Sequence, residues 1–263
     1  MSFKTATLIG SGNVAHVLGK ALVNAGLELK AVYSRNSAHS AELAQTLSTS
    51  VIDSLSDLPS SDLIFLAVSD DQIGPVSEQL PVTNAMAVHC SGAKSLEEIR
   101  YAGPKAVFYP FQSFTKGRDI GLKQVPIFLE VSQANFLEPL SQLALSLGAN
   151  PYEVSSENRR KLHLAGVIAN NFTNHLFQLS MDWLESQQLP KAVLYPLLFE
   201  TLSKAIEMGP DKAQTGPARR GDSQTVEKHL AMLADDPNLQ GLYQSFTESI
   251  QRGQSSDPNS LSS

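Results

Sequence analysis

The sequence predicts an α/β protein in two parts: a doubly wound, mostly parallel sheet, followed by a smaller all-helical domain. Two observations support this fold class. Short apolar runs alternate with helical patterns over the first half of the chain, and these strand signals stop after about residue 154. The predicted divisions are therefore an α/β domain over 1–154, a helical domain over 155–252 and a disordered tail over 253–263.

Composition narrows the class of protein further. The chain has 263 residues, a formal net charge of −6 and a single cysteine, Cys90. These values do not favour a disulfide framework, a cysteine-based zinc site or a general nucleic-acid binder. No apolar run has the length of a membrane span, and a strand begins almost at the first residue, where a signal peptide would otherwise lie. We therefore expect a cytoplasmic protein that uses no metal and has no nucleic-acid or membrane partner.

The α/β half consists of strands and helices that take turns along the chain. Continuous apolar runs indicate buried strands, and apolar residues spaced three and four apart indicate helices. Right-handed crossovers between such strands would give a doubly wound sheet. The predicted strands are 3–9, 28–34, 62–69, 84–90, 105–111, 125–131 and 150–154, and the predicted helices are 13–25, 37–47, 71–80, 94–102 and 133–148.

The second half contains helical patterns only. Apolar residues recur at spacings of three and four from Glu157 to Ser186, which predicts one long helix. A second helix begins at Pro190 and continues through Ile206. The stretch TGPARRGD (215–222) is predicted to be a loop, and further helices follow over 223–234 and 238–251.

A glycine-rich turn joins the first predicted strand to the first predicted helix. Its residues Gly10-Ser11-Gly12-Asn13-Val14-Ala15 have the G-x-G-x-x-A spacing of a dinucleotide-binding Rossmann domain. In such a turn the first glycine permits the tight bend, the second admits a pyrophosphate, and the alanine keeps helix and strand close. The alternative is an ordinary strand-to-helix turn, but its position between strand and helix favours nucleotide binding.

The end of the second strand indicates which dinucleotide is bound. NAD enzymes usually place a carboxylate there for the ribose 2′-hydroxyl. This chain instead has Ser34-Arg35-Asn36, and the guanidinium of Arg35 could pair with a 2′-phosphate. NADP is therefore favoured over NAD, although Arg35 could also be a solvated loop residue. Val68 and Ser69, at the end of a later strand, would pass near the cofactor ribose.

Polar residues follow two further strands of the predicted sheet. Ser91 lies after the strand 84–90, and Tyr109 and Gln112 lie at the end of the strand 105–111. Ligands of open α/β sheets bind at the carboxyl ends of the strands, so these residues could surround a nicotinamide and a polar substrate. Ordinary turn chemistry explains each of them singly.

The long predicted helix carries polar residues on the face away from its apolar stripe. His163, Asn170 and Asn174 share a narrow arc, and Asn171 lies between the two faces. His163 could act as a general acid, because the reference pKa of imidazole is near neutral. A solvated helix face is the alternative.

Two adjacent arginines, Arg219 and Arg220, form a further candidate site in an otherwise acidic chain. They could bind a carboxylate or phosphate of the substrate, or pair with nearby carboxylates. Asp222 is explained by capping of the helix that begins near Ser223.

The motifs IGSGNVAHVL, HCSGA, FYPFQSF, HLAGVIANNFTNHL and TGPARRGD resemble those of a known family. The chain resembles the superfamily of 6-phosphogluconate-dehydrogenase-like enzymes. Within it, the chain is similar to a subgroup of oxidoreductases in which a Rossmann-like domain precedes a helical domain of unknown function. The resemblance covers nearly the whole chain except the tail.

The resemblance implies NADP at Gly10, Gly12, Asn13 and Val14, with Ser34 and Arg35 at the 2′-phosphate. It also implies a dimer formed mainly through the helical domain, with the substrate between the domains. Two departures matter. The Lys-x-x-x-Asn pair of β-hydroxyacid dehydrogenases is missing, because Gly166 and Val167 stand four residues before Asn170 and Asn171, and Tyr109 stands where prephenate dehydrogenases have histidine.

Three functions fit these residues. The first is an NADP-dependent oxidoreductase acting on a small polar carbonyl or imine substrate, with His163, Tyr109 or Ser91 as proton donor. Asn171 and Asn174 would orient that substrate, with Gln112 beside it. The second is a non-catalytic NADP(H)-binding sensor or scaffold, because both known catalytic signatures are missing. The third, hydride exchange with a deazaflavin, requires a broad apolar cleft.

Overall fold

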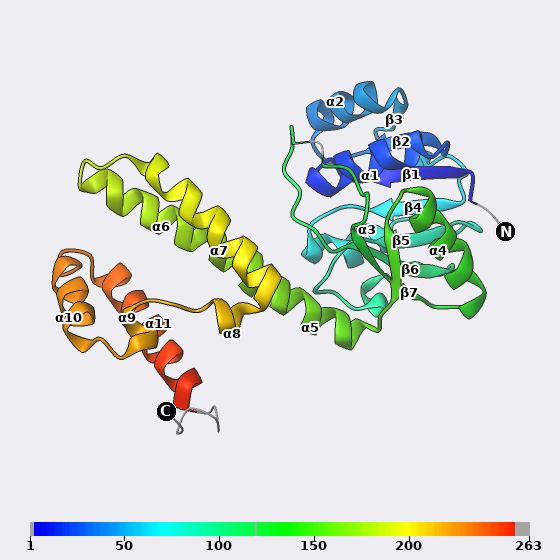
Figure 1. The fold of residues 1–263 in the computed structure, drawn as a ribbon. Helices are drawn as coiled ribbons and strands as arrows, with labels where there is room; N and C mark the ends of the chain where they lie inside the picture. Colours follow the sequence, from blue (N-terminus) through cyan, green and yellow to red (C-terminus); the bar gives the residue numbers. More distant parts are fainter. Residues whose placement is uncertain (1–2, 119, 256–263) are drawn as a thin grey trace. The chain divides into compact units, whose positions relative to one another are not determined.

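The computed structural model describes residues 3–118 and 120–255 of the chain (Figure 1). Contacts within the chain divide it into two compact units, Met1–Phe172 and Thr173–Ser263. The division falls later than residue 154, where the strand signals end, because the first helix after the sheet packs on the first unit.

The first unit is built on an 8-stranded sheet with the strand order β3-β2-β1-β4-β5-β6-β7-β8. All neighbouring strands are parallel except β6 and β7, which are antiparallel. The predicted fold class, a doubly wound and mostly parallel sheet followed by a helical region, is confirmed. The strands are β1 (Thr5–Ile9), β2 (Glu28–Tyr33), β3 (Ser50–Val51), β4 (Leu63–Leu66), β5 (Met86–His89), β6 (Lys105–Pro110), β7 (Pro126–Val131) and β8 (Asn150–Glu153).

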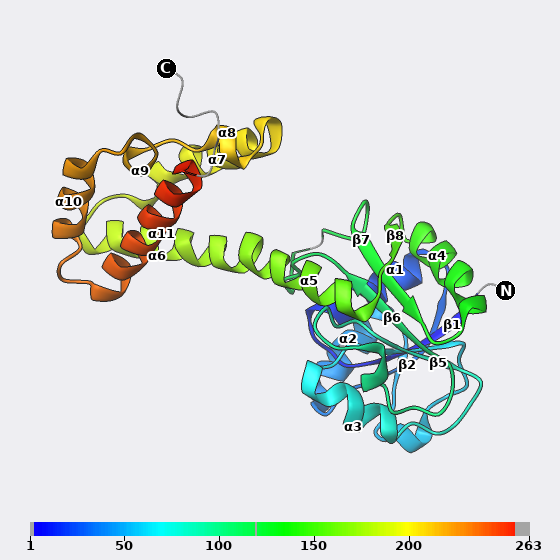
Figure 2. The same cartoon turned by 90° about the horizontal axis from the view of Figure 1, so that it is seen from below.

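Helices cover both faces of this sheet, as a parallel sheet requires. Side chains of β4 alternate between two apolar clusters: Leu63 and Phe65 join the helices α1 and α2, whereas Ile64 and Leu66 join α3. Figure 2 shows α3 and α4 on opposite sides of the sheet. These helices are α1 (Asn13–Asn24), α2 (Ser37–Leu47), α3 (Ile73–Glu78) and α4 (Leu137–Ser146).

One predicted helix of the first unit is wrong. Residues 94–102 form only a short 3-10 turn, η3 (Leu96–Glu98), followed by extended chain. Leu96, Ile99 and Tyr101 are all buried against the sheet, and the Tyr101 hydroxyl donates to the Thr83 carbonyl oxygen at 2.8 Å. Burial of these three apolar residues therefore outweighs the helical propensity of the segment.

The long helix predicted over 157–186 is present, with one irregularity. It comprises α5 (Ser156–Gly166), a π-helical turn (Val167–Phe172) and α6 (Thr173–Ser186), which follow each other without interruption. A π turn bonds each residue to the one five positions on, and such turns occur frequently at functional sites. We define this segment as the π turn.

The second unit is helical, as predicted. Its helices after α6 are α7 (Tyr195–Met208), α8 (Pro210–Ala213), α9 (Pro217–Arg220), α10 (Ser223–Met232) and α11 (Pro237–Ser255). Asp222 caps α10 as expected, because its carboxylate accepts from the Thr225 backbone N–H at 3.1 Å. The predicted loop over 215–222 contains the short helix α9, and α11 continues into the predicted tail, whose residues 256–263 lie outside the described part of the chain.

Candidate active site

The carboxyl ends of β1, β2, β4, β5 and β6 meet at one edge of the sheet, because these strands are parallel. Two cavities of the first unit are lined by residues that follow these strands. The first surrounds the glycine turn after β1, and the second begins at the end of β6.

The glycine turn has the geometry that a dinucleotide needs. Gly10 has φ 115°, and a Cβ there would lie 2.1 Å from the carbonyl oxygen of Ala67, so only glycine fits. A Cβ on Gly12 would meet no atom within 4 Å, so the backbone at the start of α1 faces open space. Backbone N–H groups and the helix dipole at such a terminus favour phosphate. The residues present therefore fit a dinucleotide.

The first cavity has a volume of about 230 Å³ and brings together residues from three strand ends. The Ser11 and Ser34 hydroxyls lie 2.9 Å apart across the β1 and β2 ends. Its walls include seven of the ten residues predicted to bind the cofactor, namely Gly10, Ser11, Gly12, Ser34, Arg35, Val68 and Ser69.

The side chains of the other three predicted cofactor residues are engaged elsewhere. Asn36 caps α2, since its amide oxygen accepts from the His39 N–H at 3.2 Å. Val14 packs against the apolar core. Asn13 donates to the Phe114 carbonyl oxygen at 2.9 Å and accepts from the Lys116 N–H at 3.1 Å. Their backbone groups, and the side-chain N–H groups of the exposed Asn36, are still available to a nucleotide.

The second cavity has a volume of about 390 Å³ and joins the end of β6 to the helical residues that close the first unit. Its walls carry four residues predicted for catalysis or substrate binding, Tyr109, Gln112, His163 and Asn171. The complete lining is Tyr109, Phe111, Gln112, Ser113, His163, Gly166, Val167, Ala169, Asn170 and Asn171. The π turn therefore supplies both asparagines at the cavity wall.

A hydrogen bond links the two candidate proton donors of this cavity. The Tyr109 hydroxyl lies 3.1 Å from His163 Nδ1. Burial, together with the nearby carboxylate of Asp70, raises the pKa of Tyr109, so the phenol keeps its proton at neutral pH. Whichever group donates in the shared bond, the pair retains one further N–H or O–H that it could donate to a ligand.

Two glycines hold this pair in place, and sequence reasoning did not identify them. A Cβ on Gly92 would lie 2.6 Å from His163 Nδ1 and 2.6 Å from Tyr109 Cζ. A Cβ on Gly166 would lie 2.7 Å from the Phe111 ring. The turn after β5 and the helix α5 can therefore approach the end of β6 only because these positions lack a side chain.

Ser91, the third predicted proton donor, serves the turn after β5. Its hydroxyl oxygen accepts from the backbone N–H groups of Ala93 and Lys94, each at 3.1 Å. Its own N–H donates to His89 Nδ1 at 3.1 Å. Burial first, and then the charge of Arg159, lower the pKa of His89 to about 4, so that this imidazole is neutral. Ser91 does not line either cavity.

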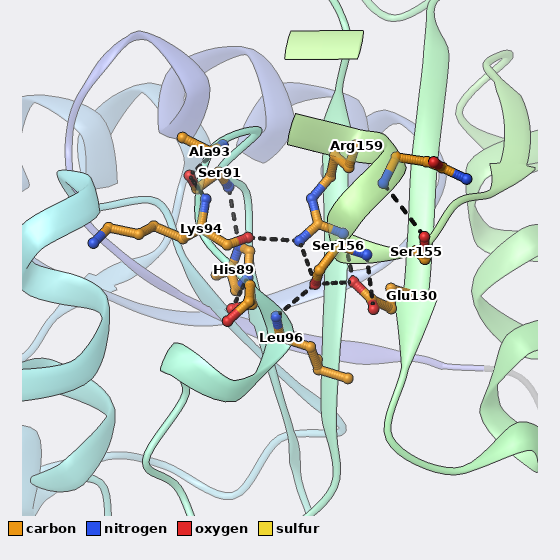
Figure 3. A network of polar contacts seen from close by, with 11 residues as sticks. His89, Ser91, Ala93, Lys94, Leu96, Glu130, Ser155, Ser156 and Arg159 are labelled. Carbon is orange, nitrogen blue, oxygen red and sulfur yellow. Dashed lines mark hydrogen bonds and ion pairs between the residues drawn. The ribbon is translucent and has the colours of Figure 1, made fainter. Parts of the chain in front are cut away.

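A buried arginine fixes the start of α5 to the sheet (Figure 3). The Arg159 side chain is fully buried, and its guanidinium donates to Glu130 Oε2 at 2.6 Å and to the Lys94 carbonyl oxygen at 2.6 Å. Ser156 adds bonds to both Glu130 oxygens, and its hydroxyl accepts from the Leu96 N–H at 3.0 Å. Since His163 lies one helical turn after Arg159, this network places the imidazole beside Tyr109.

The remaining predicted substrate residues, Asn174, Arg219 and Arg220, belong to the second unit. Asn174 lies in α6, and both arginines lie in α9. The Arg219 guanidinium lies 3.7 Å from a carboxylate oxygen of Asp211, the pairing left open as an alternative.

Two further observations concern the described residues as a whole. No group of three His, Cys, Asp or Glu side chains in the described ranges is arranged to hold a metal ion. Within the same ranges, every helix is too short or too polar to cross a membrane.

Two family models match the sequence. Residues 5–88 match a model described as NADP oxidoreductase, coenzyme F420-dependent. Residues 125–250 match a domain of unknown function, DUF2520. Among curated proteins, no significant match exists.

Solved structures similar to the chain cover nearly all of it. A Bacteroides fragilis protein described as a candidate NADP oxidoreductase is 35% identical, with a TM-score of 0.88 over 95% of this chain and 98% of that chain. An imine reductase from Myxococcus stipitatus in complex with NADP⁺ is 17% identical, with a TM-score of 0.64 over 95% and 94%. A 1-pyrroline-5-carboxylate reductase from Streptococcus pyogenes is 14% identical, with a TM-score of 0.62 over 94% and 98%. The last two likenesses concern the fold.

Proposed function

The chain belongs to the family of NADP oxidoreductases in which a Rossmann-like domain precedes a DUF2520 domain, and on this premise we propose that it transfers a hydride between NADP and a small polar carbonyl or imine substrate. One observation carries the proposal. The hydrogen-bonded pair of Tyr109 and His163 lines a cavity at the same sheet edge as the glycine turn.

The reduction of a C=O or C=N bond needs a hydride on carbon and a proton on oxygen or nitrogen. Bound NADPH supplies the hydride. The chain supplies the proton from the spare N–H or O–H of the Tyr109–His163 pair. The shared hydrogen bond lets a proton pass between the two partners, and solvent water then returns the lost proton to the pair. Asn170 and Asn171 of the π turn, with Gln112, supply amide groups that orient a polar substrate.

The polar lining also distinguishes two substrate classes. A deazaflavin, which the name of the matched family model suggests, has a wide ring system that needs a broad apolar cleft. Six of the ten residues that line the second cavity are polar, including Gln112, Ser113, Asn170 and Asn171. A small polar compound fits these groups better, because its oxygen and nitrogen atoms can form hydrogen bonds with the side-chain amides and the hydroxyl.

The test of this function is a substrate screen with NADPH and purified protein. We expect NADPH to be oxidised with a subset of small carbonyl and imine compounds, and coenzyme F420 to give no hydride exchange. Nucleotide binding without turnover of any compound would instead indicate a sensor or scaffold. Failure to bind either nucleotide would contradict the proposal.

Arg35 determines, in this proposal, the preference for NADP. Its guanidinium lines the first cavity beside Ser34, where an NAD enzyme would offer a carboxylate. We expect Arg35→Ala to weaken NADPH binding by roughly 10–100-fold, the value of a charge-assisted hydrogen bond, and to leave NADH binding unchanged. Fluorescence titration with both nucleotides measures this, with Arg160→Ala, an exposed arginine of α5, as the matched control. Equal loss for both nucleotides would contradict a role at the 2′-phosphate.

We also propose that the protein is a homodimer associated through its second unit. The helix α7 exposes a row of large apolar side chains at helical spacing: Phe199 is 73%, Leu202 61% and Ile206 75% exposed. Such an exposed apolar face is typical of a subunit interface. A second copy is the occupant that the resemblance to dimeric oxidoreductases favours.

Sedimentation equilibrium tests this association. We expect twice the chain mass of 28.4 kDa for the wild type. Phe199→Asp combined with Ile206→Asp should yield monomers, because two charges would be buried without partners. Glu200→Ala, a change at an exposed polar position of the same helix, should leave the dimer intact. A monomeric wild type would overturn this proposal.

A further inference from the structure

Asn13 connects two segments that lie far apart in the sequence. It is the first residue of α1, directly after the glycine turn, and its amide spans to the chain after β6. Its Nδ2 donates to the Phe114 carbonyl oxygen at 2.9 Å, and its Oδ1 accepts from the Lys116 N–H at 3.1 Å. The Asn13 side-chain amide therefore binds a single backbone segment through both its nitrogen and its oxygen.

That segment, residues 111–116, is named the strap here. It begins with Phe111, Gln112 and Ser113, which form one wall of the second cavity. It ends at Lys116, whose ammonium lies 2.7 Å from the Glu42 carboxylate of α2. Between these points Phe114 packs against the apolar core. The strap is thus bound to α1 and α2 at one end and forms a wall of the candidate substrate site at the other.

The charge of Lys116 also affects the pKa of a histidine in α1. Burial first, and then the Lys116 ammonium, lower the pKa of His16, which lies one turn beyond the start of that helix. The carboxylate of Glu42 opposes this effect, and Lys20 and His39 add to it. The end of the strap therefore lies close to the first turn of α1 and to the middle of α2.

We propose that Asn13 is a positioning residue that couples nucleotide binding at the glycine turn to the wall of the second cavity. This inference rests on the proposed function, because it requires phosphate groups at the backbone N–H groups of Gly12, Asn13 and Val14. Phosphate there restrains the backbone of Asn13, and its amide transmits the restraint to Phe114 and Lys116. The cavity wall of Phe111, Gln112 and Ser113 is ordered by the nucleotide, so the nucleotide binds before the substrate.

Limited trypsin digestion tests this coupling without a known substrate. Trypsin cuts after lysine, and the Lys116–Gly117 bond is exposed at the end of the strap. Mass spectrometry measures the rate of this cut in the full chain, with and without saturating NADPH. For the wild type we expect NADPH to slow the cut at least several-fold, because a ligand that binds the closed state lowers the population of the open one.

The Asn13→Ala variant separates positioning from binding. Loss of its two hydrogen bonds should speed the cut after Lys116 by roughly tenfold. NADPH affinity, titrated by fluorescence, should stay within a few-fold of wild type, yet NADPH should no longer protect the bond. Asn24→Ala, at the exposed end of the same helix, is the matched control and should behave as wild type. Glu42→Gln, which weakens only the Lys116 tether, should show partial protection.

The outcomes separate the two proposals. Absence of NADPH binding by the wild type would overturn the proposed function. Binding of NADPH without protection of Lys116–Gly117 in the wild type would overturn the coupling alone. A large loss of NADPH affinity in Asn13→Ala would show that the side chain binds the nucleotide directly, which also contradicts the positioning role. Protection that persists in Asn13→Ala would show that another contact holds the strap.

Discussion

Arg159→Met is expected to lower the free energy of unfolding of the first unit by about 3–5 kcal/mol, the cost of removing one partner from a buried ion pair. The guanidinium is fully buried, and its loss removes one 2.6 Å donor from the Glu130 carboxylate, which keeps its bonds from Ser156, and one from the Lys94 carbonyl oxygen. Hydrogen exchange in urea, read on peptides of β7 and α5, measures the change. The only tryptophan, Trp183, lies in the second unit, so its fluorescence does not serve this purpose.

Two controls make this result specific. Arg160→Met removes the neighbouring exposed arginine and should change stability by less than about 0.5 kcal/mol, as surface substitutions usually do. The double variant Arg159→Met, Glu130→Leu should recover part of the loss, because apolar residues often replace a buried pair at little cost. A loss below about 1 kcal/mol for Arg159→Met alone would contradict the role of the network.

The contribution of the pair also depends on pH. Partial burial raises the pKa of Glu130, but hydrogen bonds from Ser156 and Arg159 outweigh it and hold the pKa below the usual value of 4.5. A carboxyl with a lowered folded-state pKa stabilises the protein fully above its unfolded pKa. The contribution of Glu130 to wild-type stability should therefore be fully present above its unfolded pKa, near 4.5, and be lost as the pH falls through its lowered folded-state pKa.

Tyr109→Phe is expected to lower kcat/KM by roughly 10²–10⁴-fold on the carbonyl or imine substrate that the screen identifies, as the loss of a general acid does. The phenylalanine keeps the ring contacts with Phe111 and Phe128 but cannot share a proton with His163. His163→Gln should have an effect of the same order, and the two changes together should cost little more than either alone, because the residues act as one unit.

The measurement is steady-state kinetics with saturating NADPH, beside a nucleotide titration that should be unchanged. Tyr152→Phe, at an exposed tyrosine of β8, provides the matched control. If Tyr109→Phe and His163→Gln both retained wild-type kcat/KM, the pair would not be the proton donor. If only His163→Gln lost activity, the imidazole alone would donate the proton.

Much of the fold follows from sequence pattern. Buried strands such as β4 are continuous apolar runs in the sequence. The conformation of the glycine turn is also predictable, because glycine is the only residue type that fits at position 10 beside Ala67. The predicted helix over 94–102 failed, since burial of Ile99 and Tyr101 against the sheet is a tertiary effect that local propensity does not contain.

The candidate site was predictable only in part. Tyr109, Gln112, His163 and Asn171 carried a signal, because each is a polar residue at a strand end or on a helix face. Arg159 carried none, since a single arginine in a polar helical turn is usually solvated. Gly92 and Asn13 have structural roles that arise from contacts with residues distant in the chain, such as the close approach of Gly92 to His163 and the Asn13 bond to Phe114 at a separation of 101. No local pattern encodes such contacts.

The π turn at Val167–Phe172 has a consequence for the length of the chain. A π turn holds one residue more than an α turn, and it interrupts a helix that is otherwise regular. Deletion of Val167, Ile168 or Ala169 would leave an unbroken α-helix of ordinary geometry. The protein would fold with a normal backbone, yet Asn170 and Asn171 would be rotated away from the positions they share with His163. In genetic terms, the loss of one codon here would remove a polar cavity wall and leave the helix intact.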